Sequence, residues 1–212
     1  MLQRAFSHVV HVLRALRVLP RFPKKISKEA ISRLPVSSYQ GEIIFVDTVE
    51  LAQQSVREIQ KETLVGFDTE SRPAFSKGEK YPPSIVQVAT EDKVYIFQLP
   101  KIGQLRHLKP FLENPKIEKV GIAIHDDVLK LCDIEPFRHA GFRDISETTR
   151  ALGVEQTGLR NLCAIFLRCR ISKSSQVTDW SQEKLSARQL VYAATDAWIS
   201  RQLYLEVQRQ NT

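Results

Sequence analysis

LVGFDTE, residues 64–70, begins with an apolar run, 64–68, that ends in Asp68, and Glu70 follows two residues later. Such a run, bounded by polar sequence on both sides, is typical of a short strand buried in a sheet. Side chains alternate along a strand, so Asp68 and Glu70 are expected to point to the same side. Two carboxylates placed in this way repel each other unless a cation lies between them. For this pair alone, a solvated strand end is the simpler interpretation, because exposed acids are common.

The sequence on either side of this run predicts an α/β domain. Strands are expected at 84–90 and 93–99, joined as a hairpin, then at 119–124 and more weakly at 141–145. Helices are expected at 47–60 (with Asp47 as N-cap), 104–113, 126–132, 159–167 and 187–208. Because the strands come early and helices then alternate with them, the best class is α/β with a mixed sheet.

Length and composition exclude several classes of protein. The chain has 212 residues, of which 42% are hydrophobic and 26% charged, the balance of a protein that buries a core. Wholesale disorder, a collagen-like repeat and a polytopic membrane protein are excluded. The three cysteines, Cys132, Cys163 and Cys169, form no C-x-x-C pair. They indicate a reducing compartment, for which the cytoplasm is the expectation.

The positive charge is concentrated in an N-terminal arm, residues 1–28. The arm holds seven Lys and Arg and no acid, whereas residues 29–212 hold 24 basic and 24 acidic residues. Hydrophobic residues recur with helical spacing: Leu2, Phe6, Val9, Leu13 and Leu16. This basic amphipathic helix could dock on its own domain or a second subunit, lie on an anionic membrane or nucleic acid, or act as an organelle-targeting presequence.

Two further acidic segments follow the first. VGIAIHDDVLKL, residues 120–131, is an apolar strand that leads through Asp126 and Asp127 into a helix. Ordinary N-capping accounts for acids in this position, so the segment alone is weak support for catalysis. YAATDA, residues 192–197, lies inside the long C-terminal helix and places Tyr192 and Asp196 one turn apart on one face. Small residues surround Asp196 there, and a carboxylate buried among them needs a partner.

Together the three segments offer four carboxylates and one tyrosine. Oxygen ligands of this kind suit Mg²⁺ or Mn²⁺ rather than zinc. Four carboxylates could hold two divalent ions about 4 Å apart, an arrangement used to cleave phosphodiesters.

These segments, in this order, resemble the three motifs of the DEDD 3′–5′ exonucleases, and the tyrosine marks the DEDDy branch. The resemblance is to RNase D-like exonuclease domains and the exonuclease domain of the Werner syndrome helicase, and it covers roughly residues 40–208. DWS, residues 179–181, and Gln87 strengthen it. It implies an RNase H-like fold, with a mixed five-stranded sheet flanked by helices.

The resemblance also implies roles for individual residues. Asp68 would contact both metal ions, Glu70 the first ion and the incoming water, and Asp196 would complete the first site. Asp127, rather than Asp126, would hold the second ion, because it stands four residues before Leu131 as the motif requires. Tyr192 would orient the attacking water.

Substrate contacts are expected from Thr69, Phe75, Arg160 and Lys173. Residues 156–178 contain no acid and four basic residues, which suits phosphate binding, although a solvated helix face explains the same pattern. Aromatic side chains in the loop after Glu70 could stack on a terminal base or pack against the sheet.

The sequence therefore predicts a metal-dependent 3′–5′ exonuclease that releases nucleoside 5′-monophosphates from a DNA or RNA strand, single-stranded or overhanging. The alternative is a nuclease-like scaffold that binds nucleic acid or protein without cleavage. Residues 1–212 contain nothing that resembles a helical nucleic-acid-binding domain or a helicase. Affinity is then expected from the domain, the arm, self-association or a partner bound through the arm.

Overall fold

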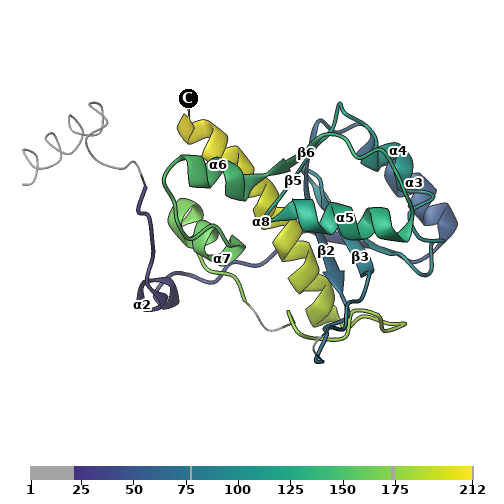
Figure 1. Ribbon diagram of the computed structural model, residues 1–212, viewed down its shortest axis with the longest axis horizontal. Helices are drawn as coiled ribbons and strands as arrows, with labels where there is room; N and C mark the ends of the chain where they lie inside the picture. Colours follow the sequence, from purple (N-terminus) through teal and green to yellow (C-terminus); the bar gives the residue numbers. More distant parts are fainter. Residues whose placement is uncertain (1–21, 77, 173–174, 212) are drawn as a thin grey trace, which may run out of the picture.

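The computed structural model describes residues 22–76, 78–172 and 175–211, which form a sheet with helices on both of its faces (Figure 1). The amphipathic helix expected in the N-terminal arm, with its hydrophobic face from Leu2 to Leu16, lies outside these ranges. Residues 22–38 lead from that arm to the sheet and include one short helix, α2 (Lys28–Ser32), capped by the Ser27 side chain.

The sheet has six strands in the order β1-β4-β3-β2-β5-β6. They are β1 (Glu42–Val46), β2 (Leu64–Ser71), β3 (Pro83–Ala89), β4 (Lys93–Gln98), β5 (Glu118–Gly121) and β6 (Phe142–Asp144). The β2–β3 and β3–β4 pairs are antiparallel and the other three pairs are parallel. The expected α/β class with a mixed sheet is confirmed, and the four strands after β2 lie where the sequence places them.

The sixth strand, β1, is the one that the sequence analysis does not predict. It pairs in parallel with β4 at the edge of the sheet, from Glu42↔Lys93 to Val46↔Phe97. Only Val46 is fully buried, and the other four residues are exposed or half-buried. A short, half-exposed edge strand lacks both the long apolar run of a central strand and a clean alternation, so its pattern is weak.

The helices follow the sequence with shifted ends. They are α3 (Val49–Ile59), α4 (Lys109–Leu112), α5 (Ile124–Ile134), α6 (Ile145–Ala151), α7 (Leu159–Leu162), the π-helix η1 (Cys163–Leu167) and α8 (Ala187–Asn211). Thr48, not Asp47, caps α3, because its side chain accepts a hydrogen bond from the Leu51 amide. Most of the expected helix 104–113 consists of turns, with Gln104 at a φ of 62° that ends any regular helix there.

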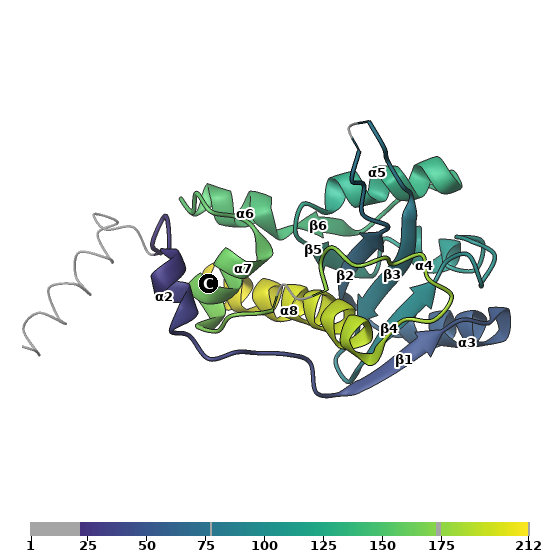
Figure 2. The ribbon, with the colours of Figure 1, turned by 90° about the horizontal axis from the view of Figure 1, so that it is seen from below.

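Two layers of helices cover the two faces of the sheet, and Figures 1 and 2 show α5 and α8 on opposite sides of β2. Val86 and Val88 face the core formed with α3, α4 and α5. Ile85 and Ala89, which alternate with them along β3, pack instead against alanines of α8. This alternation assigns each residue of the central strands to one face.

Helix α8 approaches β2 closely because both elements carry small residues at the crossing. A Cβ atom added to Gly66 would lie 1.9 Å from the Ala197 carbonyl oxygen. Ala193, Ala194 and Ala197 are fully buried on the facing side of α8. Gly66 therefore sets the distance between the helix and the strand that carries Asp68.

We expect Gly66→Ala to destabilise the protein by about 3 kcal/mol or more, because backbone atoms of α8 would have to move away from β2. Urea unfolding measures this change. Gly158→Ala is the matched control, since a Cβ there meets nothing within 4 Å, and it should cost about 1 kcal/mol or less. Equal stabilities of the two variants would show that the crossing is not tightly packed.

Candidate active site

Strand β2 brings the first two acids to the end of the sheet. Gly66, Asp68 and Glu70 share the face that α8 covers, as the period of two predicts. Gln87 lies directly across from Asp68 in the antiparallel register with β3. It is fully buried, and neither of its side-chain amide atoms has a hydrogen-bond partner among the described residues. The polar, uncharged side chain of Gln87 therefore lies beside Asp68 on the same face of the sheet.

Helix α8 supplies the third acid and the tyrosine. It begins after a capping box, in which the Ser186 amide donates to Gln189 Oε1 at 3.0 Å and the Gln189 amide donates to Ser186 Oγ at 3.3 Å. Gln189 Nε2 also donates to the Asp179 carbonyl oxygen at 3.0 Å. The neighbouring Trp180 is fully buried, with its ring 5.9 Å from that of Tyr192. The start of α8 at Ala187 is thus fixed about one and a half helical turns before Tyr192.

Asp68, Glu70 and Asp196 meet at one point. Each offers a carboxylate oxygen, and the three oxygens lie within 4.8 Å of one another. Asp196 is 6% exposed, and its Oδ1 has no hydrogen-bond partner in the described part of the chain. An oxygen buried in this way is costly unless a donor or a cation reaches it. The cluster therefore has the composition and the unsatisfied oxygen that a divalent cation fits.

Burial and mutual repulsion disfavour the charged forms of these acids. Burial, followed by the charges of Asp196 and Asp127, raises the pKa of Glu70 to about 8. Burial raises the pKa of Asp196 to about 7, against the opposing effect of a hydrogen bond with Tyr192. The pKa of Asp68 is also well above its usual value, through burial first and then the charges of Asp196, Glu70 and Asp127. A cation in the cluster would reverse this balance.

Asp127 lies beside the cluster of three rather than within it. Its Oδ1 accepts a hydrogen bond from Thr69 Oγ1 at 3.0 Å and lies 3.6 Å from Lys130 Nζ. Helix α5 has no side-chain cap: Ala123, at a φ of 54°, is its N-cap, and its amide donates to Asp144 and Ser146. The N-capping interpretation of Asp126 and Asp127 is therefore wrong, and the helix begins at Ile124 instead of 126.

A cavity of about 270 Å³ opens next to Tyr192 and Asp196. Its other walls come from the start of α7 and from the segment that follows η1, with Arg160, Asn161, Ser172 and Gln176 among the lining residues. Arg160 Nε is buried without a partner among the described residues. The sequence-predicted contact Arg160 thus lines the same cavity as two of the predicted catalytic residues, whereas Asn161 and Gln176 were not predicted.

The other predicted substrate contacts are placed differently. Thr69 is 9% exposed and bonded to Asp127, so it positions an acid. Phe75 is 83% exposed on the loop between β2 and β3, so its ring packs neither against the sheet nor against the acids. Lys173 lies outside the described residues.

Lys130 is a partner of Asp127 that the sequence analysis does not single out. The spacing could have indicated this contact, since Lys130 stands three residues after Asp127 on a helix.

The chain matches a family model described as 3′-5′ exonuclease over residues 43–211. The chain belongs to the 3′–5′ exonuclease family. Its curated relatives include the bifunctional 3′-5′ exonuclease/ATP-dependent helicase WRN of Mus musculus, 26% identical over 81% of this chain and 13% of that protein. They also include ribonuclease D of Gluconacetobacter diazotrophicus, 28% identical over 76% of this chain and 41% of the relative. The chain thus spans less than half the length of either relative.

Solved exonuclease structures share the fold. The EXO domain of Aedes aegypti Nibbler superposes with a TM-score of 0.74 at 20% identity, over 82% of this chain and 92% of that one. Escherichia coli RNase D superposes with a TM-score of 0.69 at 18% identity, over 82% of this chain and 46% of that one. The RNase H-like fold expected from the motifs is confirmed. The family is metal-dependent, and Asp68, Glu70 and Asp196 are the residues that could bind the metal.

No helix in the described ranges combines the length and hydropathy that crossing a membrane requires.

We expect the metal-free protein to lose stability as the pH rises from about 5 to about 8. The folded pKa values of Glu70 and Asp196 lie above those of unfolded chains, so the folded state binds more protons in this window and its stability falls with pH. Urea unfolding in EDTA should show a fall of about 2 kcal/mol or more. Asp196→Asn should flatten the profile. An equally steep fall in that variant would contradict the assignment to these carboxylates.

Proposed function

We propose that this protein is a metal-dependent 3′–5′ exonuclease that hydrolyses DNA or RNA from the 3′ end and releases nucleoside 5′-monophosphates. The observation that carries the proposal is the meeting of three carboxylates from β2 and α8, one buried and two half-buried, within 4.8 Å. A scaffold that only bound a partner would gain nothing from acids that raise one another's pKa. Burial of such a cluster is explained when cations offset its charge.

The residues divide into two groups around the reacting phosphate. Glu70, Asp196 and Tyr192 stand on the side where water would attack, and the Tyr192 hydroxyl orients that water. Burial, followed by the charges of Asp196 and Glu70, raises the pKa of Tyr192 far above its usual value, so its hydroxyl keeps its proton and acts as a donor. Asp127, held by Thr69 and paired with Lys130, stands on the side of the departing 3′ oxygen.

Two Mg²⁺ or Mn²⁺ ions, held by Asp68, Glu70, Asp196 and Asp127, would lower the pKa of the attacking water and stabilise the departing oxygen. Asp68 is the acid that both ions would share. Thr69 fixes the Asp127 carboxylate with a hydrogen bond of 3.0 Å, and Lys130 lies 3.6 Å from the same oxygen. Binding of an ion there would therefore compete with the lysine.

The substrate class that fits is a strand with a free 3′ end, single-stranded or overhanging. The cavity beside Asp196 carries one arginine and several side chains that can hydrogen-bond. Such groups can contact phosphate and sugar without selecting a base. A related fold, RNase D of Trypanosoma brucei, has been solved in complex with an RNA, U12 (TM-score 0.70, 18% identity, 84% of this chain and 64% of that one). The cytoplasm is the proposed location, consistent with three free cysteines.

Asp127→Asn should lower the rate of cleavage by about 10²- to 10³-fold, because it removes a negative charge from the proposed metal site while keeping the hydrogen bond to Thr69. The assay follows 5′-labelled DNA and RNA oligonucleotides in Mn²⁺, where a ladder that shortens from the 3′ end is expected for the unmodified protein. Asp126→Asn is the control, since Asp126 is exposed on the same helix turn. Similar activity in both variants, or an intact substrate with the unmodified protein, would reject the proposal.

Tyr192→Phe should reduce the turnover rate by about 10²-fold without changing the affinity for Mn²⁺, because only the hydroxyl that orients water is removed. Rates come from single-turnover cleavage and metal affinity from calorimetry. If the variant instead loses Mn²⁺ binding, Tyr192 supports the metal site and does not orient the water.

A further inference from the structure

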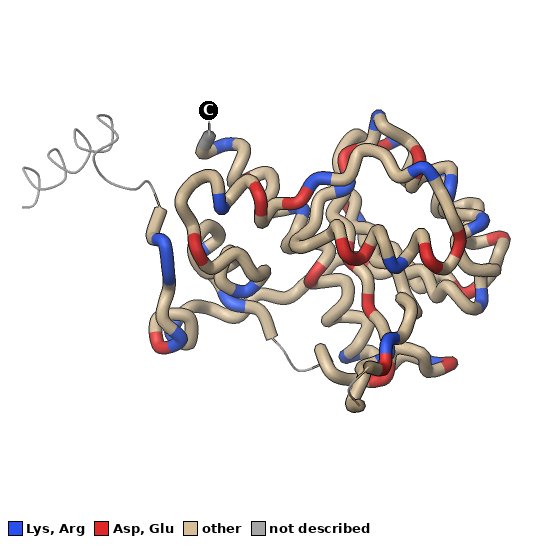
Figure 3. The backbone as a smooth tube through the Cα atoms, viewed as in Figure 1, with Lys and Arg blue, Asp and Glu red and all other residues tan. Residues whose placement is uncertain are grey.

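One flank of the domain gathers basic side chains from two segments that are distant in sequence. We call basic flank the Lys and Arg of residues 22–38 and 155–172: Lys24, Lys25, Lys28, Arg33, Arg160, Arg168 and Arg170. The same two segments contain only two acids, Glu29 and Glu155. Figure 3 shows the basic positions along the N-terminal segment and the neighbouring α7 region.

Backbone hydrogen bonds hold the two segments together. The Arg170 amide donates to the Pro35 carbonyl at 2.9 Å, and the Ser37 amide donates to the Arg170 carbonyl at 2.8 Å. Farther along, the buried Phe22 ring lies 4.6 Å from that of Phe166 in η1. The N-terminal segment is therefore packed onto the domain, so the charges of the flank keep fixed positions.

Much of this charge is not neutralised within the domain. Lys24 and Lys25 form ion pairs with Glu155, at 3.8 and 2.9 Å. Lys28, Arg33 and Arg168 are exposed and form no ion pair with any residue in the described ranges. A fixed group of like charges attracts a polyanion.

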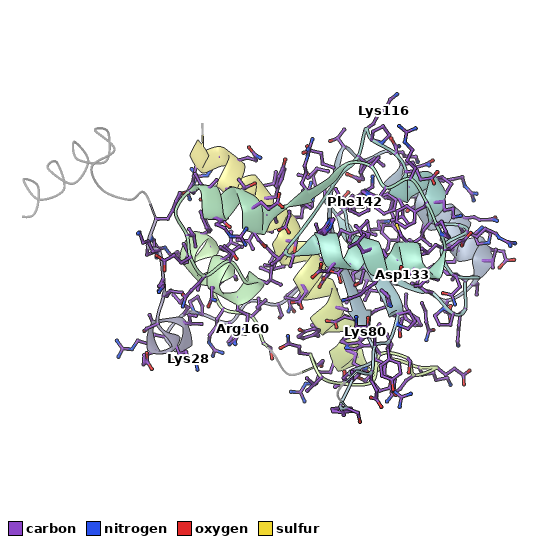
Figure 4. All side chains as sticks on the ribbon, in the orientation of Figure 1. Lys28, Lys80, Lys116, Asp133, Phe142 and Arg160 are labelled. Atoms are coloured by element: carbon purple, nitrogen blue, oxygen red, sulfur yellow. The ribbon has the colours of Figure 1, made fainter. Side chains whose placement is uncertain are left out.

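The basic flank is continuous with the active site through Arg160. Figure 4 shows Lys28 and Arg160 on the same side of the molecule, and Figure 2 places α2 beside α7. Arg160 lines the cavity shared with Tyr192 and Asp196. The hollow on the opposite side of the acids differs, because its two lysines, Lys80 and Lys130, are matched by Asp126 and Asp133. The positively charged side chains of the flank thus adjoin the site on the side of Arg160.

Arg168 has a backbone conformation that favours glycine. It ends η1 with a φ of 56° and a ψ of 31°, the left-handed region. Glycine adopts this conformation at a helix end without strain, whereas an arginine does not. Its side chain is exposed, so packing does not explain its presence.

We propose that the basic flank binds the phosphates of the substrate strand upstream of its 3′ end, a role that rests on the proposed exonuclease function. A strand whose 3′ end lies at the carboxylates must leave the site, and its backbone charge is best accommodated over α7 and α2. These contacts are independent of base sequence and weaken with salt. They supply affinity for long strands.

The test compares long and short substrates with the full chain. The variant Lys28→Glu/Arg33→Glu/Arg168→Glu should bind a 24-nucleotide single strand about tenfold or more weakly at 0.1 M salt, measured by fluorescence anisotropy in EDTA. The slope of log Kd against log salt concentration should be smaller by about 2 for this variant, because each of the three lost phosphate contacts contributes about 0.7 to the slope. Cleavage of a trinucleotide, which ends before the flank, should change by no more than about twofold. Lys116→Glu, on the far side of the molecule (Figure 4), is the control for a single charge reversal away from the flank and should leave the affinity unchanged.

Unchanged affinity of the triple variant for the 24-nucleotide strand would overturn the proposal. If that variant instead loses binding to phosphatidylserine vesicles, the flank binds membrane lipids and the proposal is equally overturned. The binding measurement can be interpreted separately from the proposed exonuclease function, because it is made in EDTA and does not depend on cleavage. Absence of cleavage of either length by the unmodified protein would reject the exonuclease function alone.

Arg168→Gly separates binding from folding. Its urea midpoint should stay the same or rise, because glycine suits the left-handed position. Its Kd for the 24-nucleotide strand should rise by about two- to threefold, with a salt dependence shallower by about 0.7. If this variant is stable and its Kd is unchanged, Arg168 does not bind the strand.

Discussion

Helix α8 can lie against β2 only because Gly66 has no side chain, and this one close contact forces three carboxylates together. The Ala197 carbonyl occupies the space that a Cβ of residue 66 would need. Asp196, one residue before Ala197, is thereby held against Asp68 and Glu70 on the strand. Like charges in a buried site repel strongly. The free energy for holding them there comes from the hydrophobic faces of the sheet and helix, which pack fully buried residues on both sides.

The central part of the fold could be predicted because its strands are buried and its patterns are strong. The run at β2 and the β3–β4 hairpin are continuous apolar segments. Strands β3 and β4 lie within one residue of the expected bounds, and β2 continues three residues beyond its expected end at Asp68. The sequence does not predict the edge strand β1, because its half-exposed residues follow no clear period. It does not predict the short helix α6 either, because two of the three residues that α6 buries, Ser146 and Thr149, are polar. The sequence pattern predicts the π-helix η1 as the end of an α-helix, because five residues are too few for the two periodicities to differ clearly.

The candidate site was predictable for a different reason, since its acids lie in three separate segments that each have a recognisable form. Spacing on β2 and α8 is enough to place Asp68 with Glu70 and Tyr192 with Asp196. Spacing could not show that Thr69 holds Asp127 outside the tight cluster, because that contact joins residues 58 positions apart. Spacing also could not show that Phe75 faces solvent, or that the segment around Arg168 packs against the N-terminal segment. Such contacts depend on how loops pack, which local patterns do not encode.

The position of α8 in the chain also has a consequence for biosynthesis. Its residues are made after every strand of the sheet, yet α8 covers one whole face and contributes Asp196 to the site. A nascent chain that ends before residue 187 therefore exposes an apolar sheet and holds an incomplete set of acids. On the ribosome, the hydrophobic face and the acidic cluster are completed by the same docking event.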